Sequence, residues 1–587
     1  MSAPYERSAL EHPDSLFDHI ARLHRLHPDG PLPDGGDPLP DTAVAQRRSC
    51  ETTTSEERSA TLVAAWESYI ADPEARPEPI RDVFTRPEMS IFDGEYAKED
   101  IPLPGPDPER LRQLGIWLVR NSSDRRPVLA GLSLLSATGT SEDIPLLRTI
   151  ALASCFVRGA VAALGAIAGT APDLVWLAQH TKSTERQCVL QGLVDASDPV
   201  ARHWLLRNAL IFSSPARNAY ALHIAEVTGL AAALTEADRD DRVRDQAIGL
   251  LLQMTSHDDY ATVIDRYPDA KRALALVAAE TTWMTPTSDR YADLTALVED
   301  LRTGASACLD WADDEREAVL DRLLRVLRSP AWTRTLNVSA DSDPYCSWRA
   351  RWARNIVDAP YDAEGPRRFE IRISMPIPPR PGVLGGVETR ILVDGRPIIA
   401  EQFRQGAARS PEWLLLRHEL RATETPRVVK LASAWCAEGC CGALHVEIVQ
   451  EGDEVLWRGT DQGIGPLIPE FRFPAAEYDR EVARAEADHA WEWPARTLVR
   501  LLTTALREDP SILARWNCSI DWIGAHLGEY DRTTLCFIDE STDPREQFSF
   551  GLQLGPIAPA DQARSIIEAF KTAHPRNLFG YLDDRRG

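Results

Sequence analysis

A chain of 587 residues is longer than a single hydrophobic core usually supports, so its length predicts several domains. Its composition, 44% hydrophobic and 26% charged, is that of a globular protein with enough apolar residues to build cores. The formal net charge of −24 repels phosphate, which argues against nucleic-acid binding and favours a basic protein partner, although the same charge also serves solubility alone.

A reducing bacterial cytoplasm is the compartment that the sequence indicates. The N-terminus has no basic segment followed by an apolar one, and no apolar run reaches the roughly eighteen residues that a membrane span needs. The ten cysteines are scattered apart from one cluster, as expected for reduced thiols. Arginine supplies nearly all of the basic residues, a bias typical of high-GC bacterial genomes.

Residues 1–106 are predicted to be irregular with short helices. One amphipathic helix is expected from Ser15 to Leu26, and a second is expected to begin near Ser55. The proline-rich segment 101–108 prevents a helix from continuing and predicts a domain boundary.

Residues 107–330 are predicted to form an α-solenoid of short amphipathic helices. Segments 155–165, 198–206 and 241–252 each place an arginine early in a helix, followed by apolar residues at helical spacing. These arginines, Arg158, Arg202 and Arg244, are about forty residues apart, the period of two-helix repeats, and we interpret them as structural residues that mark the repeat. The pattern resembles HEAT repeats, which implies a binding surface more often than an active site. An ordinary α-helical bundle is the competing interpretation.

Residues 331–475 are predicted to form an antiparallel β domain, either a sandwich or a barrel, because the hydrophobic period changes from about 3.6 to 2 after Pro330. Turn sequences at 393–396 and 450–453 predict two hairpins. The expected strands and hairpins cover residues 369–375, 387–403, 413–420, 428–435 and 443–457, with a loop at 376–386.

Residues 476–587 are predicted to form a small α/β domain. The expected elements are helices over 478–487, 493–502 and 560–573 and strands around 518–527, 533–538 and 548–554. The predicted fold class is therefore multidomain α+β: a HEAT-like α-solenoid, an antiparallel β domain and an α/β domain. The segments Cys436–Gly442 and Trp491–Pro494 resemble motifs of uncharacterised proteins from high-GC bacteria, a resemblance that implies no activity.

A cysteine cluster is the sharpest candidate site. Cys436, Cys440, Cys441 and His445 fall within ten residues around a predicted turn, and four soft ligands are what a tetrahedral zinc site requires. The spacing is not that of paired Cys-x-x-Cys motifs, and adjacent cysteines are expected to point to opposite faces. Three interpretations remain open: buried structural thiols, a zinc or other soft-metal site, and a redox-active pair or disulfide.

Two tryptophans, Trp491 and Trp493, precede Pro494 and are candidates for an exposed aromatic anchor at a binding surface. The alternative interpretation is that they dock domains within the chain.

The sequence contains none of the common signatures of hydrolases, zinc proteases, P-loop proteins or dinucleotide-binding proteins, so we expect neither catalytic residues nor a cofactor other than zinc. The expected function is a non-enzymatic binding or neutralising protein that uses the solenoid surface, without nucleic-acid or membrane partners. The alternatives are a HEAT-like enzyme of the lyase or DNA glycosylase type, the latter requiring a basic groove, and a zinc-dependent module at Cys436–His445.

Overall fold

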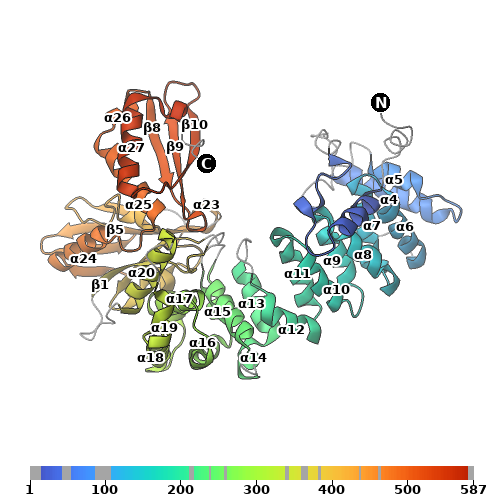
Figure 1. The fold of residues 1–587 in the computed structure, drawn as a ribbon, viewed down its shortest axis with the longest axis horizontal. Coiled ribbons are helices and arrows are strands. Elements are labelled where there is room, and N and C mark those ends of the chain that lie inside the picture. Colours follow the sequence, from blue (N-terminus) through green and yellow to red (C-terminus); the bar gives the residue numbers. More distant parts are fainter. Residues whose placement is uncertain are drawn as a thin grey trace. The chain divides into compact units, whose positions relative to one another are not determined.

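The computed structural model describes residues 15–42, 55–85, 107–210, 217–236, 240–256, 261–337, 343–358, 368–380, 385–434, 436, 438–460 and 465–578. Contacts divide the chain into two compact units, Met1–Ser214 (unit 1) and Pro215–Gly587 (unit 2), which are described separately (Figure 1). The division falls inside the range 107–330, and the three boundaries between the four predicted domains remain predictions. Most of the proline-rich segment 101–108 lies outside the described residues.

The described part of unit 1 is helical. Its α-helices are α2 (Leu16–Leu26), α4 (Ser55–Ala71), α5 (Glu78–Phe84), α6 (Pro108–Asn121), α7 (Arg125–Thr138), α8 (Ile144–Ile150), α9 (Val157–Gly165), α10 (Ala171–His180), α11 (Ser183–Asp195) and α12 (Pro199–Asn208). The helix predicted from Ser15 to Leu26 is confirmed, and Ser15 caps it, because its hydroxyl accepts the Asp18 backbone N–H. The helix expected near Ser55 is also present.

Glycines allow α6 and α7 to approach until their backbones touch. A Cβ atom placed on Gly131 would lie 2.8 Å from the carbonyl oxygen of Gly115, and one on Gly115 would lie 3.0 Å from that of Gly131. Farther along, α7 contacts α9 and α9 contacts α11, whereas α8 contacts α10 and α10 contacts α12. Consecutive helices therefore alternate between two sets.

The helical part of unit 2 repeats this alternation. Its α-helices are α13 (Arg217–Thr228), α14 (Leu230–Glu236), α15 (Asp241–Thr255), α16 (Ala270–Glu280), α17 (Ser288–Thr303), α18 (Glu315–Leu327), α19 (Pro330–Thr333) and α20 (Pro344–Asp358). Contacts run from α13 to α15 to α17 to α20 in one set and from α14 to α16 to α18 in the other.

Arginine–carboxylate pairs join helices that are distant in sequence. In unit 1, the Arg112 Nε atom of α6 lies 2.7 Å from an Asp143 carboxylate oxygen, and both side chains are buried. In unit 2, Arg244 of α15 pairs with Glu280 of α16 at 2.7 Å. The three arginines interpreted as repeat markers are not equivalent, because Arg244 is buried whereas Arg158 and Arg202 are exposed.

Two small antiparallel sheets follow the helices of unit 2. One contains β1 (Phe369–Ser374), β2 (Glu388–Val393) and β3 (Arg396–Pro397), and the other contains β4 (Arg427–Ser433), β5 (Ala443–Glu451), β6 (Glu454–Gly459) and β7 (Phe471–Pro474). The Thr389 N–H donates to the carbonyl of Arg409, whose own N–H donates to the carbonyl of Leu431, so one connecting segment links the sheets. Both hairpins predicted from turn sequences are confirmed.

The two sheets share one apolar core with α24 (Ala475–Ala487). Phe369 of β1 stacks on Tyr478 of α24 with ring centroids 4.6 Å apart and meets Trp457 of β6 edge-on. The Tyr478 hydroxyl donates to the carbonyl of Leu420 at 2.6 Å, which satisfies both polar groups in the core.

Helix α24 also covers the free edge of β1. The Ile371 N–H donates to the Glu481 carboxylate at 2.8 Å, and the Arg484 guanidinium donates to the Ile371 carbonyl at 2.6 Å. Unpaired edge groups can pair with another strand, so these two side chains protect the edge.

The strand predicted over 413–420 is wrong. Ser410 and Pro411 begin the short helix α22 (Pro411–Leu414), and turns follow it. Leu414 and Leu415 are both buried, a consecutive pattern that a strand with one exposed face does not produce. The hairpin predicted over 387–403 also ends early, because α21 (Ile398–Gln402) follows the two-residue strand β3.

The last part of unit 2 contains α25 (Pro494–Glu508), α26 (Ser511–Ala514), β8 (Cys518–Gly524), β9 (Arg532–Asp539), β10 (Glu546–Gln553) and α27 (Pro559–Thr572). The three predicted strands and the final helix are confirmed, and the sheet is antiparallel with the order β10-β9-β8. Leu498 of α25 and Phe570 of α27 share a core with Phe537 of β9, and Figure 1 shows α27 lying along the sheet.

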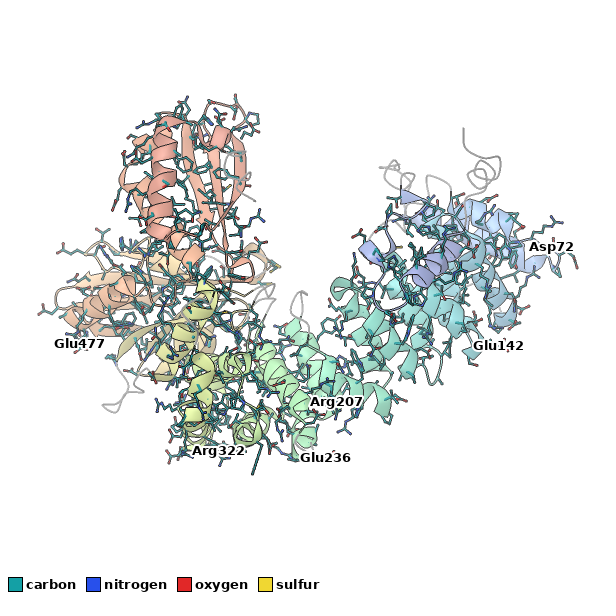
Figure 2. All side chains as sticks on the ribbon, viewed as in Figure 1. Asp72, Glu142, Arg207, Glu236, Arg322 and Glu477 are labelled. Atoms are coloured by element: carbon teal, nitrogen blue, oxygen red, sulfur yellow. The ribbon has the colours of Figure 1, made fainter. Side chains whose placement is uncertain are left out.

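Charged side chains cover the outside of both units, as Figure 2 shows for Glu142 of unit 1 and for Glu236, Arg322 and Glu477 of unit 2. Among the described residues, no helix combines the length and apolar character that crossing a membrane would require.

Candidate functional site

A cavity of about 560 Å³ lies in unit 2 between the helices α17 and α20, the strands β1 and β2, and the segment that follows α24. This volume is in the range typical of ligand pockets, roughly 300–1,000 Å³. We call it the charged cavity, because its lining contains five arginines and five carboxylates: Arg302, Arg316, Arg372, Arg396, Arg484, Glu299, Glu370, Asp394, Glu401 and Asp488.

The charges in the cavity wall neutralise one another. Arg372 pairs with Glu370 on the same strand, and Arg396 Nε lies 2.8 Å from a carboxylate oxygen of Glu401. Arg484 pairs with Glu481 at 2.7 Å, and the hydrogen bond to Glu481 raises the pKa of Arg484. The wall is therefore polar but close to neutral, which reduces the cost of burying it.

The mouth of the charged cavity lies at the β2–β3 turn. The side chain of Arg396 is 72% exposed there, whereas Arg302, on the α17 side, donates to the Ile356 carbonyl of α20 at 2.9 Å. The turn depends on Gly395 and Asp394, which both have positive φ angles, 75° and 51°. The predicted turn sequence thus sets the rim of the cavity.

The two tryptophans predicted as an exposed anchor are buried. Trp491 is 7% exposed and Trp493 is 2% exposed. Trp348 of α20 donates its indole N–H to the Trp491 carbonyl at 3.1 Å and packs edge-on against Trp493. Trp491 and Trp493 therefore do not form an exposed anchor, because the Trp491 carbonyl and the Trp493 ring dock this segment against α20. Trp491 does line the charged cavity, and ligand binding through it remains a prediction.

The second candidate is the thiol cluster, formed by Cys436, Cys440 and Cys441 in the connection between β4 and β5. Its three sulfur atoms lie within 4.8 Å of one another, and all three residues are exposed. The Sγ atoms of Cys440 and Cys441 are 3.6 Å apart, so the adjacent cysteines do not point to opposite faces. They share one turn of the short helix α23 (Glu438–Cys441), not a strand, which explains the difference from the expectation.

Backbone hydrogen bonds close the turn that presents these thiols. The Ala434 N–H donates to the Gly442 carbonyl, and the Gly442 N–H donates to the Glu438 carbonyl, each at 3.0 Å. Gly442 has a φ angle of 90°, which an L-residue with a side chain rarely adopts. The glycine therefore lets the chain leave α23 and enter β5 directly.

His445, the fourth predicted ligand, contacts Glu438 and not the thiols. Its Nε2 atom lies 3.3 Å from one Glu438 oxygen, and the other oxygen pairs with Lys430 of β4. The arrangement follows from the strand register, which places Lys430 directly opposite His445. Metal binding by the predicted four residues stays a prediction.

Ionisation differs among these groups. Hydrogen bonding to Cys436 and then to Cys440 raises the pKa of Cys441 to about 12. Burial lowers the pKa of His445, and the hydrogen bond from Lys430 lowers the pKa of Glu438. The Cys441 thiol is therefore protonated at neutral pH, whereas the neighbouring Glu438 carboxylate is charged.

Sequence reasoning missed the charged cavity, because its lining comes from residues 299–491 and no local pattern joins them. The one available signal was the Asp394–Gly395 turn, which was recognised as a hairpin and not as a rim. No known protein family, no characterised protein and no solved structure matches this chain.

Proposed function

We propose that this chain is a non-enzymatic binding protein that holds a charged segment of a protein partner in the charged cavity. The observation that supports this proposal is a bounded volume of about 560 Å³ with five arginines and five carboxylates on its wall. A charged group of the ligand, positive or negative, can replace the like-charged member of an arginine–carboxylate pair in the cavity wall. The ligand group then pairs with the remaining member. A peptide segment with both basic and acidic side chains has the chemistry that fits such a wall.

The net charge of −24 supports a partner that is basic overall. Long-range attraction raises the rate at which oppositely charged proteins meet, whereas the local pairing in a cavity decides specificity. The partner would then be a basic protein whose bound segment also carries acidic residues.

The sequence assigned binding to the surface of HEAT-like repeats. The alternating contacts of α7–α12 and of α13–α18 are those expected of stacked helix pairs and support that resemblance as a proposal. We place the primary site in the charged cavity because it is a concave site with defined chemistry, and we treat the helical surface as its rival.

The enzymatic alternatives are less well supported. A DNA glycosylase needs a basic groove for the phosphate backbone. In the helical part of the chain, Arg112, Arg148, Arg244 and Arg290 each pair with carboxylates, which argues against a basic groove at these positions.

The test is a quantitative affinity capture with three forms of the full chain. Ala307→Trp places an indole in the cavity lining, and Ala232→Trp makes the same change at a half-buried position of α14 outside the lining. We expect a partner that the wild type and Ala232→Trp retain and that Ala307→Trp loses. A partner that all three retain would place binding elsewhere, for example on the helical surface, and would overturn the cavity assignment.

A further inference from the structure

The thiol cluster is independent of the charged cavity and has a chemistry of its own. Among the described residues, Cys436, Cys440 and Cys441 are the one set in which three atoms able to bind a metal ion lie within 4.8 Å of one another. Structural cysteines are usually buried, whereas these three are exposed, so packing does not account for them.

The distances between the sulfur atoms suit a single ion. A metal–thiolate bond of about 2.3 Å places tetrahedral sulfur ligands about 3.8 Å apart, and trigonal ones about 4.0 Å apart. The Cys440–Cys441 separation is 3.6 Å, and the largest separation in the cluster is no more than 4.8 Å. Side-chain rotations that move the sulfur atoms by about 1 Å or less would therefore bring all three into bonding geometry.

Among the described residues, the cluster contains three ligands and not four. The Nε2 atom of His445, the candidate fourth ligand, contacts one carboxylate oxygen of Glu438. The other oxygen of Glu438 pairs with Lys430. Three thiolates without an imidazole favour a soft ion that accepts three-coordination, such as Cu(I), over Zn(II), which prefers four ligands. The backbone that holds the thiols is anchored at both ends by the Ala434–Gly442 hydrogen bond and the Ser433–Ala443 strand pair.

We propose that Cys436, Cys440 and Cys441 form a three-thiolate site for a thiophilic metal ion, with Cu(I) as the preferred ion. Each cysteine loses its thiol proton and forms one metal–sulfur bond, so binding releases protons and changes no oxidation state.

The test uses the reduced, metal-free full chain and a competing Cu(I) chelator. We expect about one Cu(I) per chain, and a loss of affinity of more than about 100-fold for each of Cys436→Ser, Cys440→Ser and Cys441→Ser, because losing a ligand exceeds the roughly 10- to 100-fold cost of losing an outer-shell partner. Cys346→Ser, a change at another exposed cysteine, is the matched control and should bind as the wild type does. X-ray absorption should show three sulfur neighbours.

The variant His445→Asn distinguishes a three-thiolate site from a four-ligand zinc site that includes His445. Unchanged Cu(I) affinity in His445→Asn supports the three-thiolate set. Stoichiometric Zn(II) binding that His445→Asn weakens as strongly as a cysteine variant would overturn it. Binding well below one Cu(I) per chain, or an equal loss in Cys346→Ser, would also overturn it. Because the three cysteines are exposed, the serine variants should keep the melting temperature of the metal-free wild type, which verifies that they fold.

Discussion

The charged cavity and the thiol cluster belong to the same unit, but they differ in whether their polar groups are paired with other groups of the fold. In the cavity, each lining arginine has a carboxylate or carbonyl partner, as Arg484 has in Glu481 and Ile371. In the cluster, the exposed sulfurs have one another as neighbours. Burial forces polar groups to find partners when the chain folds, so the fold itself requires partners for the buried members of the wall, such as Glu370. The thiols are exposed to solvent, so folding does not require them in the same way.

Stability should therefore depend strongly on charged residues near the cavity and weakly on those near the cluster. The first prediction concerns Arg390, a buried residue of β2 that pairs with Glu388 at 3.0 Å and lies 3.7 Å from Asp300 of α17. Arg390→Met leaves two buried carboxylates without their cation, and we expect the free energy of unfolding to fall by about 3–5 kcal/mol. Urea unfolding and the hydrogen exchange of backbone amides in β2 and α17 both measure this loss of unfolding free energy.

The matched control for Arg390 is Arg396→Met, at the exposed mouth of the cavity. Exposed ion pairs contribute about 0–1 kcal/mol, so this variant should unfold almost as the wild type does. Similar losses of unfolding free energy in Arg390→Met and Arg396→Met would show that burial does not make an ion pair more important for stability.

The second prediction concerns pH and Asp293 of α17. Burial raises the pKa of Asp293 to about 6, although Arg380 lies beside it. The folded state therefore holds this proton more tightly than the unfolded chain, so the contribution of Asp293 to stability is highest below about pH 4 and is lost as the pH rises through about 6. The loss across this window should be on the order of 2 kcal/mol. Asp293→Asn should remove this pH dependence of stability. Asp289→Asn, which changes an exposed residue of the same helix, should keep it.

The third prediction concerns Glu481, which protects the edge of β1 at the cavity floor. Glu481→Ala leaves the Ile371 N–H without its acceptor, and we expect the free energy of unfolding to fall by about 1–3 kcal/mol. The Ile371 amide should also exchange faster in hydrogen-exchange experiments. Glu477→Ala changes an exposed residue one turn earlier on the same helix and should alter neither quantity. Unchanged exchange at Ile371 in Glu481→Ala would contradict this account.

The fourth prediction concerns Glu438 beside the thiol cluster. Glu438→Gln removes the partner of Lys430 and His445, and we expect stability to change by less than about 1 kcal/mol because the carboxylate is partly exposed. The Glu438 charge raises the pKa of His445 against the lowering by burial, so the variant should show a lower His445 pKa in an NMR titration. Glu451→Gln, at the far end of β5, should leave that pKa unchanged.

Local patterns predicted most of the elements in this chain. The turn residues Asp394 and Gly395 located one hairpin, and hydrophobic periodicity located the strands β8 to β10. The sequence also identified the three cysteines that the structure brings together. It failed at residues 413–420, where a run of apolar residues was interpreted as a strand although Pro411 begins a helix.

The remaining features depend on contacts between distant residues. His445 faces Glu438 because strand register sets Lys430 opposite it, and register is not encoded by local spacing. Trp491 and Trp493 are buried because Trp348, 143 residues before Trp491, packs against them. The charged cavity exists only once α17, α20 and β1 are assembled. Tertiary packing, and not local sequence, decides all three.

Site-specific photo-crosslinking in the native host tests the central claim most directly, namely that the charged cavity binds a partner segment. A photoreactive residue replaces Asn355, an exposed residue of the cavity lining, or Arg322, an exposed residue of α18 outside it. We predict a crosslinked partner at position 355 that is absent at position 322 and that Ala307→Trp abolishes. Crosslinking at position 322 with none at position 355 would contradict the assignment of the cavity as the binding site.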